Sequence, residues 1–264
     1  MQTDFLITKY ISKNTDNNKD IDYNIDNLKK NLYDEGILTK DYKDEDLILL
    51  YNRYENNNKN PMERECRSVI IDRKQLKIIC YTCNTPISNM EAVDYILNYT
   101  DKNKEIFQCY EGTLLSVFNN NDKWYLSTRR CLDSKNSKWN ETTHFDMFMD
   151  VLNQNNYTDF DSFTKKLEKD NCYYFILIHH KNKNIIDYTN KFGKDYKKLC
   201  LAFIRNKNTQ DEINYNDLEL QFITDDIFIP EKLTDLKSFD EENKNNHFNE
   251  NPENEGVIIK VQMN

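Results

Sequence analysis

Glycine is scarce in this chain, and this scarcity constrains the fold more than any other feature of the sequence. The chain has 4 glycines in 264 residues, whereas roughly 7% is usual. Glycine is needed where the backbone takes a positive φ or passes very close to another atom. Two of the four follow a glutamate, in Glu111-Gly112-Thr113 and Glu255-Gly256-Val257. Next to apolar runs, such a pair is typical either of a turn at a strand end or of a pocket for a nucleotide or a metal.

The charge balance is acidic, with 36 Lys and Arg against 45 Asp and Glu and a formal net charge of -9. Dedicated nucleic-acid binders usually carry a basic domain or patch. RNA would therefore have to be bound through a local basic cleft or recognised at one end. The balance suits a small ligand or a protein partner more readily, and 17 Tyr and 14 Phe supply the volume of a globular core.

Cysteine usage and hydropathy indicate where the protein works. Seven scattered cysteines form no even disulfide framework and suit a reducing compartment. Cys80 and Cys83 are one half of a zinc pattern whose second half is missing, so no metal site is predicted. With no apolar stretch of 18 residues and no signal segment, we expect no membrane contact and a cytoplasmic location. The composition, rich in Asn, Lys, Ile and Tyr, suggests AT-rich codons, as in a large DNA virus or a parasite. For a viral protein, the location would be the host cytoplasm.

Hydrophobic periodicity predicts an α+β chain in which helices and strands are intermixed. Residues 1–60 read as a polar, partly helical extension, followed by one domain over 61–264 without a separate C-terminal domain. In the extension we predict helices over 26–33, which Gly36 would end, and over 44–54. The domain is predicted to contain strands at 68–72, 77–81, 106–107, 114–118, 124–127, 173–178, 199–204 and 257–259 and helices at 89–99, 145–152 and 160–167, with a hairpin turn at 119–122.

Several short motifs follow one another in a recognisable order. They are Glu65-Cys66-Arg67, Tyr110-Glu111-Gly112-Thr113, Ser127-Thr128-Arg129-Arg130, an aromatic strand followed by Asn182, and Glu255-Gly256-Val257-Ile258-Ile259-Lys260. Over roughly residues 60–264, this order resembles the adenylation domain of the phage-type RNA ligases, which are grouped with DNA ligases and mRNA capping enzymes. The resemblance implies a nucleotidyltransferase fold of mixed antiparallel sheets with flanking helices.

The resemblance also implies a reaction. In that family, a lysine in the pattern Lys-x-Asp/Glu-Gly attacks the α-phosphate of ATP and carries AMP to an RNA 5′-phosphate. A divalent metal and basic side chains stabilise the charge on the transferring phosphoryl group. An active member would therefore need ATP and Mg²⁺.

The chain departs from the family pattern at the residues that carry this reaction. Cys109 stands three residues before Gly112, where the family has its nucleophilic lysine, and a thiol cannot form the phosphoramidate. Ile176 stands at an acidic position, and we expect the family's terminal Lys-x-Lys strand to be missing. The retained residues implied to bind the nucleotide or RNA are Arg67, Glu111, Gly112, Arg129, Asn182, Glu255 and Lys260, with Arg130 as an additional charge.

We therefore predict a catalytically degenerate ligase-like domain that needs no cofactor and binds a nucleotide, a cap-like structure or an RNA 5′ end. Under this prediction Cys109 is either a buried strand cysteine or a reactive thiol. One alternative is an active ATP-dependent RNA ligase whose nucleophile is displaced to Lys104. A second alternative is a protein-interaction module without a nucleotide, with a partner chain at the sheet edge that the missing strand leaves open.

Three further groups of residues are candidates for contacts with RNA. Arg129-Arg130 is a candidate phosphate site because guanidinium groups grip phosphate bidentately, although the pair could also be a solvated strand edge. Trp139 could stack on a base or act as a packing residue. In His179-His180, strand alternation predicts one buried ring and one exposed ring, and Lys181 and Lys183 follow as possible phosphate contacts.

Overall fold

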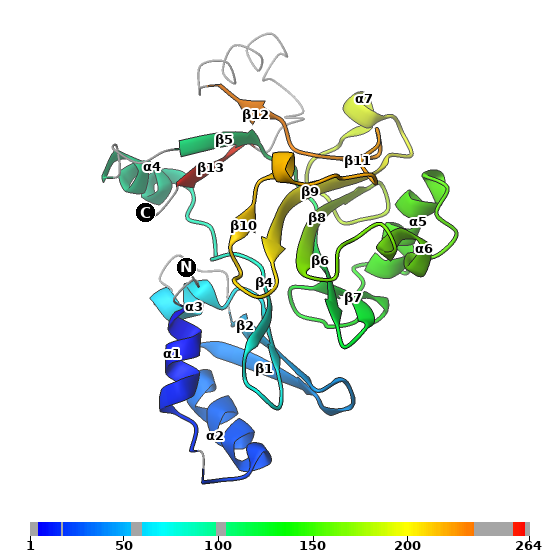
Figure 1. Ribbon diagram of the computed structural model, residues 1–264. Coiled ribbons are helices and arrows are strands. Elements are labelled where there is room, and N and C mark those ends of the chain that lie inside the picture. Colours follow the sequence, from blue (N-terminus) through cyan, green and yellow to red (C-terminus); the bar gives the residue numbers. More distant parts are fainter. Residues whose placement is uncertain (1–4, 17, 54–59, 99–103, 235–255, 262–264) are drawn as a thin grey trace.

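The structure is a computed structural model that describes residues 5–16, 18–53, 60–98, 104–234 and 256–261. In these ranges the strands form three sheets with helices at their sides (Figure 1). Every strand pairing is antiparallel except that of one short strand. The predicted α+β class with mixed antiparallel sheets and flanking helices is confirmed.

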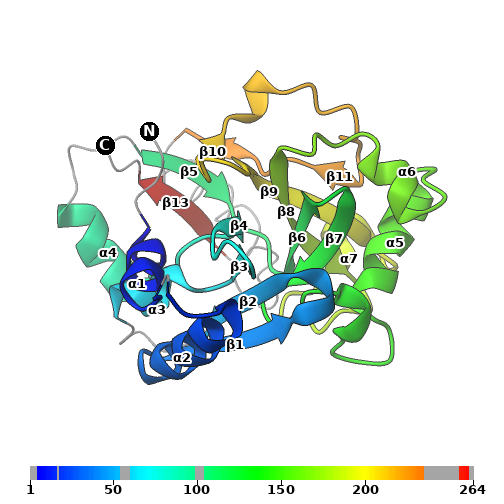
Figure 2. The same ribbon diagram turned by 60° about the horizontal axis from the view of Figure 1, so that its bottom comes forward.

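Sheet A has four strands in the order β1-β2-β3-β4. Their bounds are Ile37–Tyr42, Leu47–Asn52, Val69–Asp72 and Ile78–Tyr81. Helices α1 (Leu6–Lys13) and α2 (Ile21–Asp34) pack on one face of this sheet, where they build a single apolar core with it (Figure 2). Because β1 and β2 precede residue 60 and β3 and β4 follow it, the expected division at residue 60 passes through this sheet.

The N-terminal predictions were partly right. Helix α2 contains the predicted helix 26–33, and Gly36 follows its end with a φ of 82°. The predicted helix over 44–54 was wrong, because this segment forms a short 3₁₀ turn, η1 (Lys43–Glu45), and then strand β2. Strand β2 is central in sheet A and buried on both faces, so its apolar residues are continuous and imitate a helical pattern.

Sheet C has six strands, five of them in the order β10-β9-β8-β6-β7. Their bounds, in chain order, are β6 Thr113–Asn120, β7 Lys123–Thr128, β8 Asn171–His179, β9 Lys197–Asn206 and β10 Glu212–Ile213, and β11 (Ile227–Phe228) pairs in parallel with β9. Helices α5 (His144–Gln154) and α6 (Phe160–Thr164) cover one face with an aromatic-rich core. The other face packs on sheet A, so sheets A and C share a core.

Sheet B joins distant parts of the chain. Its order is β12-β5-β13, with β5 at Lys104–Gln108, β12 at Lys232–Leu233 and β13 at Val257–Val261. Helix α4 (Asn89–Asn98) lies beside it in both views (Figures 1 and 2). The remaining elements are α3 (Pro61–Glu65), α7 (Thr189–Phe192) and the 3₁₀ turns η2 (Ser134–Asn136) and η3 (Tyr215–Asp217).

The predicted elements from residue 68 onward are confirmed in type and approximate position. The hairpin turn at 119–122 is tighter than expected, because β6 continues to Asn120 and the turn consists of Asn121 and Asp122, with φ of 50° and 61°. Among the helices that the structure describes, none is long and apolar enough to cross a lipid bilayer.

Candidate functional site

The turn between β5 and β6 contains Cys109, which the sequence resemblance predicts to occupy the position of a nucleophile. Cys109 directly follows β5 and is half-buried, so it is not the fully buried strand cysteine that was one of its two predicted forms. Its backbone N–H donates to the Gly256 carbonyl oxygen at 3.1 Å. The segment before Gly112 and the segment after Glu255 therefore meet at this point, although Glu255 itself lies outside the described residues.

The two glycines are required for different reasons. A Cβ on Gly112 would stand 2.4 Å from the Leu177 carbonyl oxygen and 2.7 Å from Ile176 Cγ2, so this position needs glycine for close approach of β6 to β8. Gly256 has a φ of 124°, with open space where a Cβ would be, and needs glycine for its backbone conformation.

Glu111 and Asn182 bind the protein's own backbone and side chains. The Glu111 carboxylate accepts the N–H groups of Ile185, at 2.7 and 2.9 Å, and of Ile186, at 2.5 Å, while its own N–H donates to Tyr188 Oη at 2.6 Å. Asn182 Nδ2 donates to Thr113 Oγ1 at 3.0 Å. These two residues hold the loop after β8 against the start of β6.

A cavity of about 30 Å³ lies between sheets B and C. Its lining is mainly apolar and consists of Phe107, Gln108, Tyr110, Ile176, Cys200, Ala202, Pro230, Ile258 and Lys260. Pockets for small-molecule ligands usually measure roughly 300–1,000 Å³. Ile176, which the sequence resemblance predicts to occupy an acidic position, therefore helps to line a space that fits a water molecule and is too small for a nucleotide.

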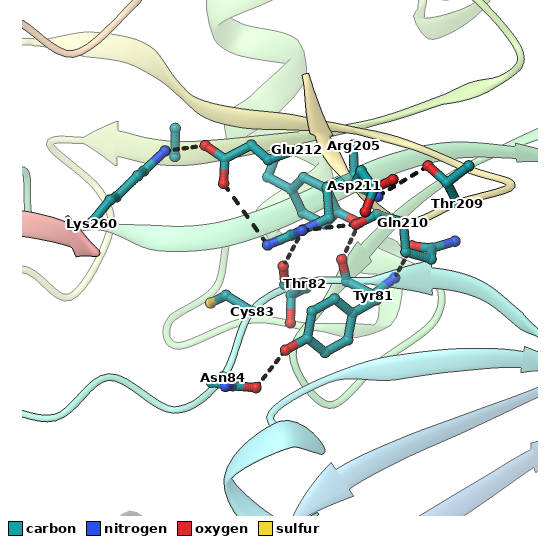
Figure 3. Close-up of polar contacts among 12 residues, drawn as sticks. Tyr81, Thr82, Cys83, Asn84, Arg205, Thr209, Gln210, Asp211, Glu212 and Lys260 are labelled. Atoms are coloured by element: carbon teal, nitrogen blue, oxygen red, sulfur yellow. Dashed lines mark hydrogen bonds and ion pairs between the residues drawn. The ribbon is translucent and has the colours of Figure 1, made fainter. Parts of the chain in front are cut away.

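Lys260 has its charge neutralised within the fold. Its ammonium pairs with Glu212 on β10 and lies 5.0 Å from the centre of the Phe107 ring (Figure 3). Glu212 is also 3.9 Å from Arg205, whose Nε donates to the Thr82 carbonyl oxygen at 2.9 Å. Lys260 thus links sheet B to sheet C and to the end of sheet A.

Lys104, the candidate for a displaced nucleophile, lies at the first residue of β5. Five residues separate it from Cys109, or about 16 Å along a regular strand. Its Nζ donates to the Ile96 carbonyl oxygen of α4 at 3.4 Å.

Arg129 and Arg130, the pair predicted to bind phosphate, lie where β7 ends, close to the end of β2. Arg129 directly follows β7, is half-buried and donates to the Oδ1 of buried Asn52. Burial, and then the neighbouring charge of Arg130, lower the pKa of Arg129 to about 10. Arg130 is exposed, and Arg67 donates to Cys83 Sγ at 3.4 Å.

Arg129 carries its charge at an energetic cost, because its guanidinium is partly removed from water and lies beside the charge of Arg130. An anion placed beside Arg129 and Arg130 would remove that cost. Among the predicted site residues, Arg129 and Arg130 thus form a pair of adjacent guanidinium groups, one half-buried and one exposed.

The histidine pair differs from its prediction. His179 is fully buried, but His180 is half-buried and its ring stacks on that of His179 at 4.6 Å between centroids. Strand β8 ends at His179, so the alternation of faces does not extend to His180. Lys181 Nζ lies 3.9 Å from the Asp150 carboxylate, and Trp139 is 63% exposed.

Sequence reasoning missed Asn52 and Lys40, which both contact the arginine pair. Lys40 Nζ donates to the Arg130 carbonyl oxygen at 2.6 Å. Asn52 lies in the segment predicted as a helix, and no pattern in the sequence places β1 and β2 beside the end of β7. Within the described ranges, no three His, Cys, Asp or Glu side chains gather to hold a metal ion.

Comparison with known proteins shows similarity in structure but not in sequence. No protein-family model and no curated protein matches the chain. Its fold is similar to that of a protein assigned as an ATP-dependent DNA ligase from Aquifex aeolicus, with 15% identity, a TM-score of 0.51 and coverage of 89% of this chain and 58% of that one. An archaeal ATP-dependent RNA ligase is similar at 11% identity and a TM-score of 0.52, with coverage of 88% and 56%.

The chain thus spans less than two thirds of the length of both ligases. Identities this low establish the fold alone. The sheets and helices described above therefore have a fold similar to that of these ATP-dependent ligases.

Proposed function

We propose that this protein binds the phosphate of a nucleotide or of an RNA 5′ end at Arg129 and Arg130 and transfers no nucleotidyl group. The observation that carries the proposal is the placement of Arg129, which is half-buried at the end of β7 next to the exposed Arg130. Burial and the charge of Arg130 also lower the pKa of Arg129. A bound phosphate would accept hydrogen bonds from both side chains and offset their mutual repulsion.

Three features support binding without covalent transfer. Cys109 has no amine with which to form a phosphoramidate, and Ile176 supplies no carboxylate for a metal or a ribose. The cavity between sheets B and C is roughly tenfold smaller than ordinary ligand pockets. The surface at the end of β7 is therefore the better location for a phosphate-bearing ligand.

The displaced-lysine alternative has less support. Lys104 starts β5, whereas the turn with Cys109 follows its end. A direct attack by Lys104 on a phosphate beside that turn would require a rearrangement of sheet B. The similarity to ATP-dependent ligases nonetheless makes nucleotides and RNA the natural ligands to test.

Binding of short RNAs that carry a 5′-phosphate, a 5′-hydroxyl or a cap analogue tests the proposal. We expect the 5′-phosphate to bind most tightly and Arg129→Gln to weaken that binding about tenfold or more, since charge-assisted hydrogen bonds contribute about 1.5–3 kcal/mol. Fluorescence anisotropy measures the affinities. Incubation with labelled ATP or GTP and Mg²⁺ should leave no labelled protein on a denaturing gel.

Lys169→Gln is the matched control, because this lysine pairs with Asp122 at the turn between β6 and β7, at the opposite end of β7 from Arg129. Equal affinities for 5′-phosphate and 5′-hydroxyl RNA would contradict phosphate recognition. A covalent adduct at Cys109 or at a lysine would instead show an active transferase. Absence of binding to all these ligands would favour the interaction-module alternative.

A further inference from the structure

The free edge of strand β7 lies in a large groove that the proposed function does not use. The groove measures about 1310 Å³ and is lined by the turn between β1 and β2, by β7 and by helices α5 and α6. Strand β7 is an outer strand of sheet C (Figure 2). We propose that this groove binds an extended peptide segment of a partner protein, which adds a strand to sheet C beside β7. Small-molecule pockets are usually smaller, at roughly 300–1,000 Å³.

Backbone groups of β7 are directed toward this groove. The tight turn at 121–122 makes Asn120 and Lys123 the first hydrogen-bonded pair of the hairpin. Because bonded and non-bonded pairs alternate in an antiparallel ladder, Trp124 and Leu126 direct their N–H and C=O groups away from β6. Within the described ranges, these groups have no backbone partner. Leu126 is buried and Trp124 is half-buried, so the backbone of Trp124 is the more accessible to a ligand.

The chain itself already pairs with this edge at one position. Thr128 is the next residue of β7 whose backbone faces away from β6, and it forms a bridge with Cys131. The Thr128 N–H donates to the Cys131 carbonyl oxygen at 2.8 Å, and the Cys131 N–H donates to the Thr128 carbonyl oxygen at 3.4 Å. The edge at Trp124 and Leu126 is the same edge one turn of the ladder earlier, and unpaired edges of this kind accept a further strand.

Aromatic rings line the groove on both faces of the strand. Phe145, Phe160 and Trp124 are half-buried and pack against the core beneath α5 and α6. Tyr42 and Tyr125 belong to the core that sheet C shares with sheet A. Successive side chains of an added strand point to opposite faces, so they would contact the two walls in turn. Walls on both faces favour a single extended segment over the edge of a second folded sheet.

The charge of the groove matches a peptide rather than a polyanion. Carboxylates and lysines line it in nearly equal number. Two of these lysines, Lys123 and Lys169, are paired with Glu45 and Asp122. The groove therefore lacks the basic surface that nucleic-acid binders present. A peptide offers uncharged backbone groups to β7 and can place side chains of either sign at the rim.

Backbone methylation of a bound peptide tests strand addition with the unmodified full chain. The probe is a phage-displayed library of random peptides of about eight residues, within the usual length of a strand. Each enriched peptide is synthesised, and its backbone nitrogens are methylated one at a time. We expect the affinity to fall about fivefold or more at alternate positions and to change little at the positions between them, because only every second N–H of an added strand faces β7. Fluorescence anisotropy measures the affinities.

A pair of variants tests the β7 side of the same contact. Trp124→Pro and Trp124→Ala both remove the indole, but only proline also removes the outward N–H, and an edge strand tolerates proline at such a position. We expect Trp124→Pro to bind the peptide about fivefold or more weakly than Trp124→Ala. Trp139→Ala is the matched control, because it removes an exposed tryptophan that does not line the groove, and it should bind like the unmodified protein. Arg129→Gln should leave the peptide affinity unchanged, which separates this site from the proposed phosphate site.

Several results would overturn strand addition at β7. Failure to enrich any peptide would mean that the groove holds none. Enriched peptides that lack the alternating sensitivity to methylation would dock through side chains alone. Displacement of a bound peptide by a single-stranded RNA oligomer would assign the groove to nucleic acid. Thermal melting verifies that each variant is folded, and if Trp124→Pro is not, the methylated peptides decide the question on the unmodified protein.

Discussion

At the scale of the residue, the positions that the sequence motifs single out act mainly as internal contacts. Glu111 caps two backbone N–H groups of the loop after β8, Asn182 binds Thr113, and Lys260 pairs with Glu212. The sequence correctly marks these residues as special, since each has a tertiary partner. It does not show whether their polar atoms face a ligand or the protein, because that depends on contacts between segments distant in sequence.

Gly112 provides a test at this scale. Gly112→Ala places a Cβ 2.4 Å from the Leu177 carbonyl oxygen, and a backbone atom in a paired strand cannot move aside easily. Overpacking of this kind costs about 1–3 kcal/mol or more. We expect a loss of unfolding free energy in this range in urea denaturation.

Gly193→Ala is the matched control, because Gly193 has a φ of 87° and no atom within 4 Å of the position that a Cβ would take. This variant experiences backbone strain alone, about 1–3 kcal/mol, because its φ of 87° and ψ of 167° lie in a region that essentially only glycine adopts. A loss below about 1 kcal/mol for Gly112→Ala would mean that the close approach of β6 to β8 is not what requires a glycine at position 112.

At the scale of the element, strand β2 shows where sequence patterns stop being informative. Ile48 and Leu50 face the core with α1 and α2, whereas Leu47 and Leu49 face the core shared with sheet C. A strand that is apolar on both faces has no alternation, so its pattern cannot be distinguished from that of a buried helix. Because the segment of β2 was predicted as a helix, neither sheet A nor the contact between its Asn52 and Arg129 could be predicted.

The hairpin between β6 and β7 offers a prediction at this scale. Asn121 and Asp122 both have positive φ, in a two-residue turn that favours Asn-Gly. Asp122→Gly should relieve the strain of the positive φ at this position, but it also removes the exposed ion pair with Lys169. The net result should be a rise in unfolding free energy of about 0.5 kcal/mol. Thermal melting should show a rise in Tm of about 1–2 °C.

Lys169→Ala measures the ion pair separately. A Tm for Asp122→Gly below that of Lys169→Ala would mean that the turn gains nothing from glycine at its second position.

At the scale of the whole molecule, buried histidines link stability to pH. His179 is fully buried where sheet C meets α5, with Asp150 at 3.3 Å, Lys197 close to the same carboxylate and His180 stacked on its ring. Burial, and then the charge of His180, lower the pKa of His179 to about 4. The folded protein therefore holds His179 neutral over a range in which the unfolded chain protonates it.

The sign of the pH dependence follows from this difference. Between pH 6.5 and about 4 the unfolded state binds the extra proton, so the unfolding free energy falls as the pH falls, by about 3 kcal/mol for His179 alone. Paired carboxylates such as Asp22 and Asp41, whose pKa values are lowered, lose their contribution at still lower pH. Urea denaturation across this range measures the slope.

His179→Asn removes the titrating ring and should flatten the slope between pH 6.5 and 4, even if it lowers stability overall. An unchanged slope would mean that His179 is not the group that links folding to protons in this range.

The overall class of the fold could be predicted from the sequence, but the arrangement of its sheets relative to one another could not. Most strands and helices beyond residue 68 follow from periodicity and turn residues. From the sequence, Cys109 and Ile176 are predicted to replace a reactive amine and a carboxylate, and Arg129 is predicted to supply a cation; these stay predictions. The closure of the cavity between sheets B and C and the contacts of Lys40 with Arg130 and of Asn52 with Arg129 arise from tertiary packing, which no local pattern encodes.

The pairing of β5 with β13 has a consequence for the order in which the molecule assembles. Its partner strands lie about 150 residues apart in the chain. On the ribosome, β5 emerges long before β13 and must wait while sheets A and C are completed, because distant contacts form only after the intervening chain is made. The Lys260–Glu212 bridge therefore forms only after the whole segment from β5 to β13 has been made, and a nascent chain passes through a stage in which β5 is paired with neither β12 nor β13.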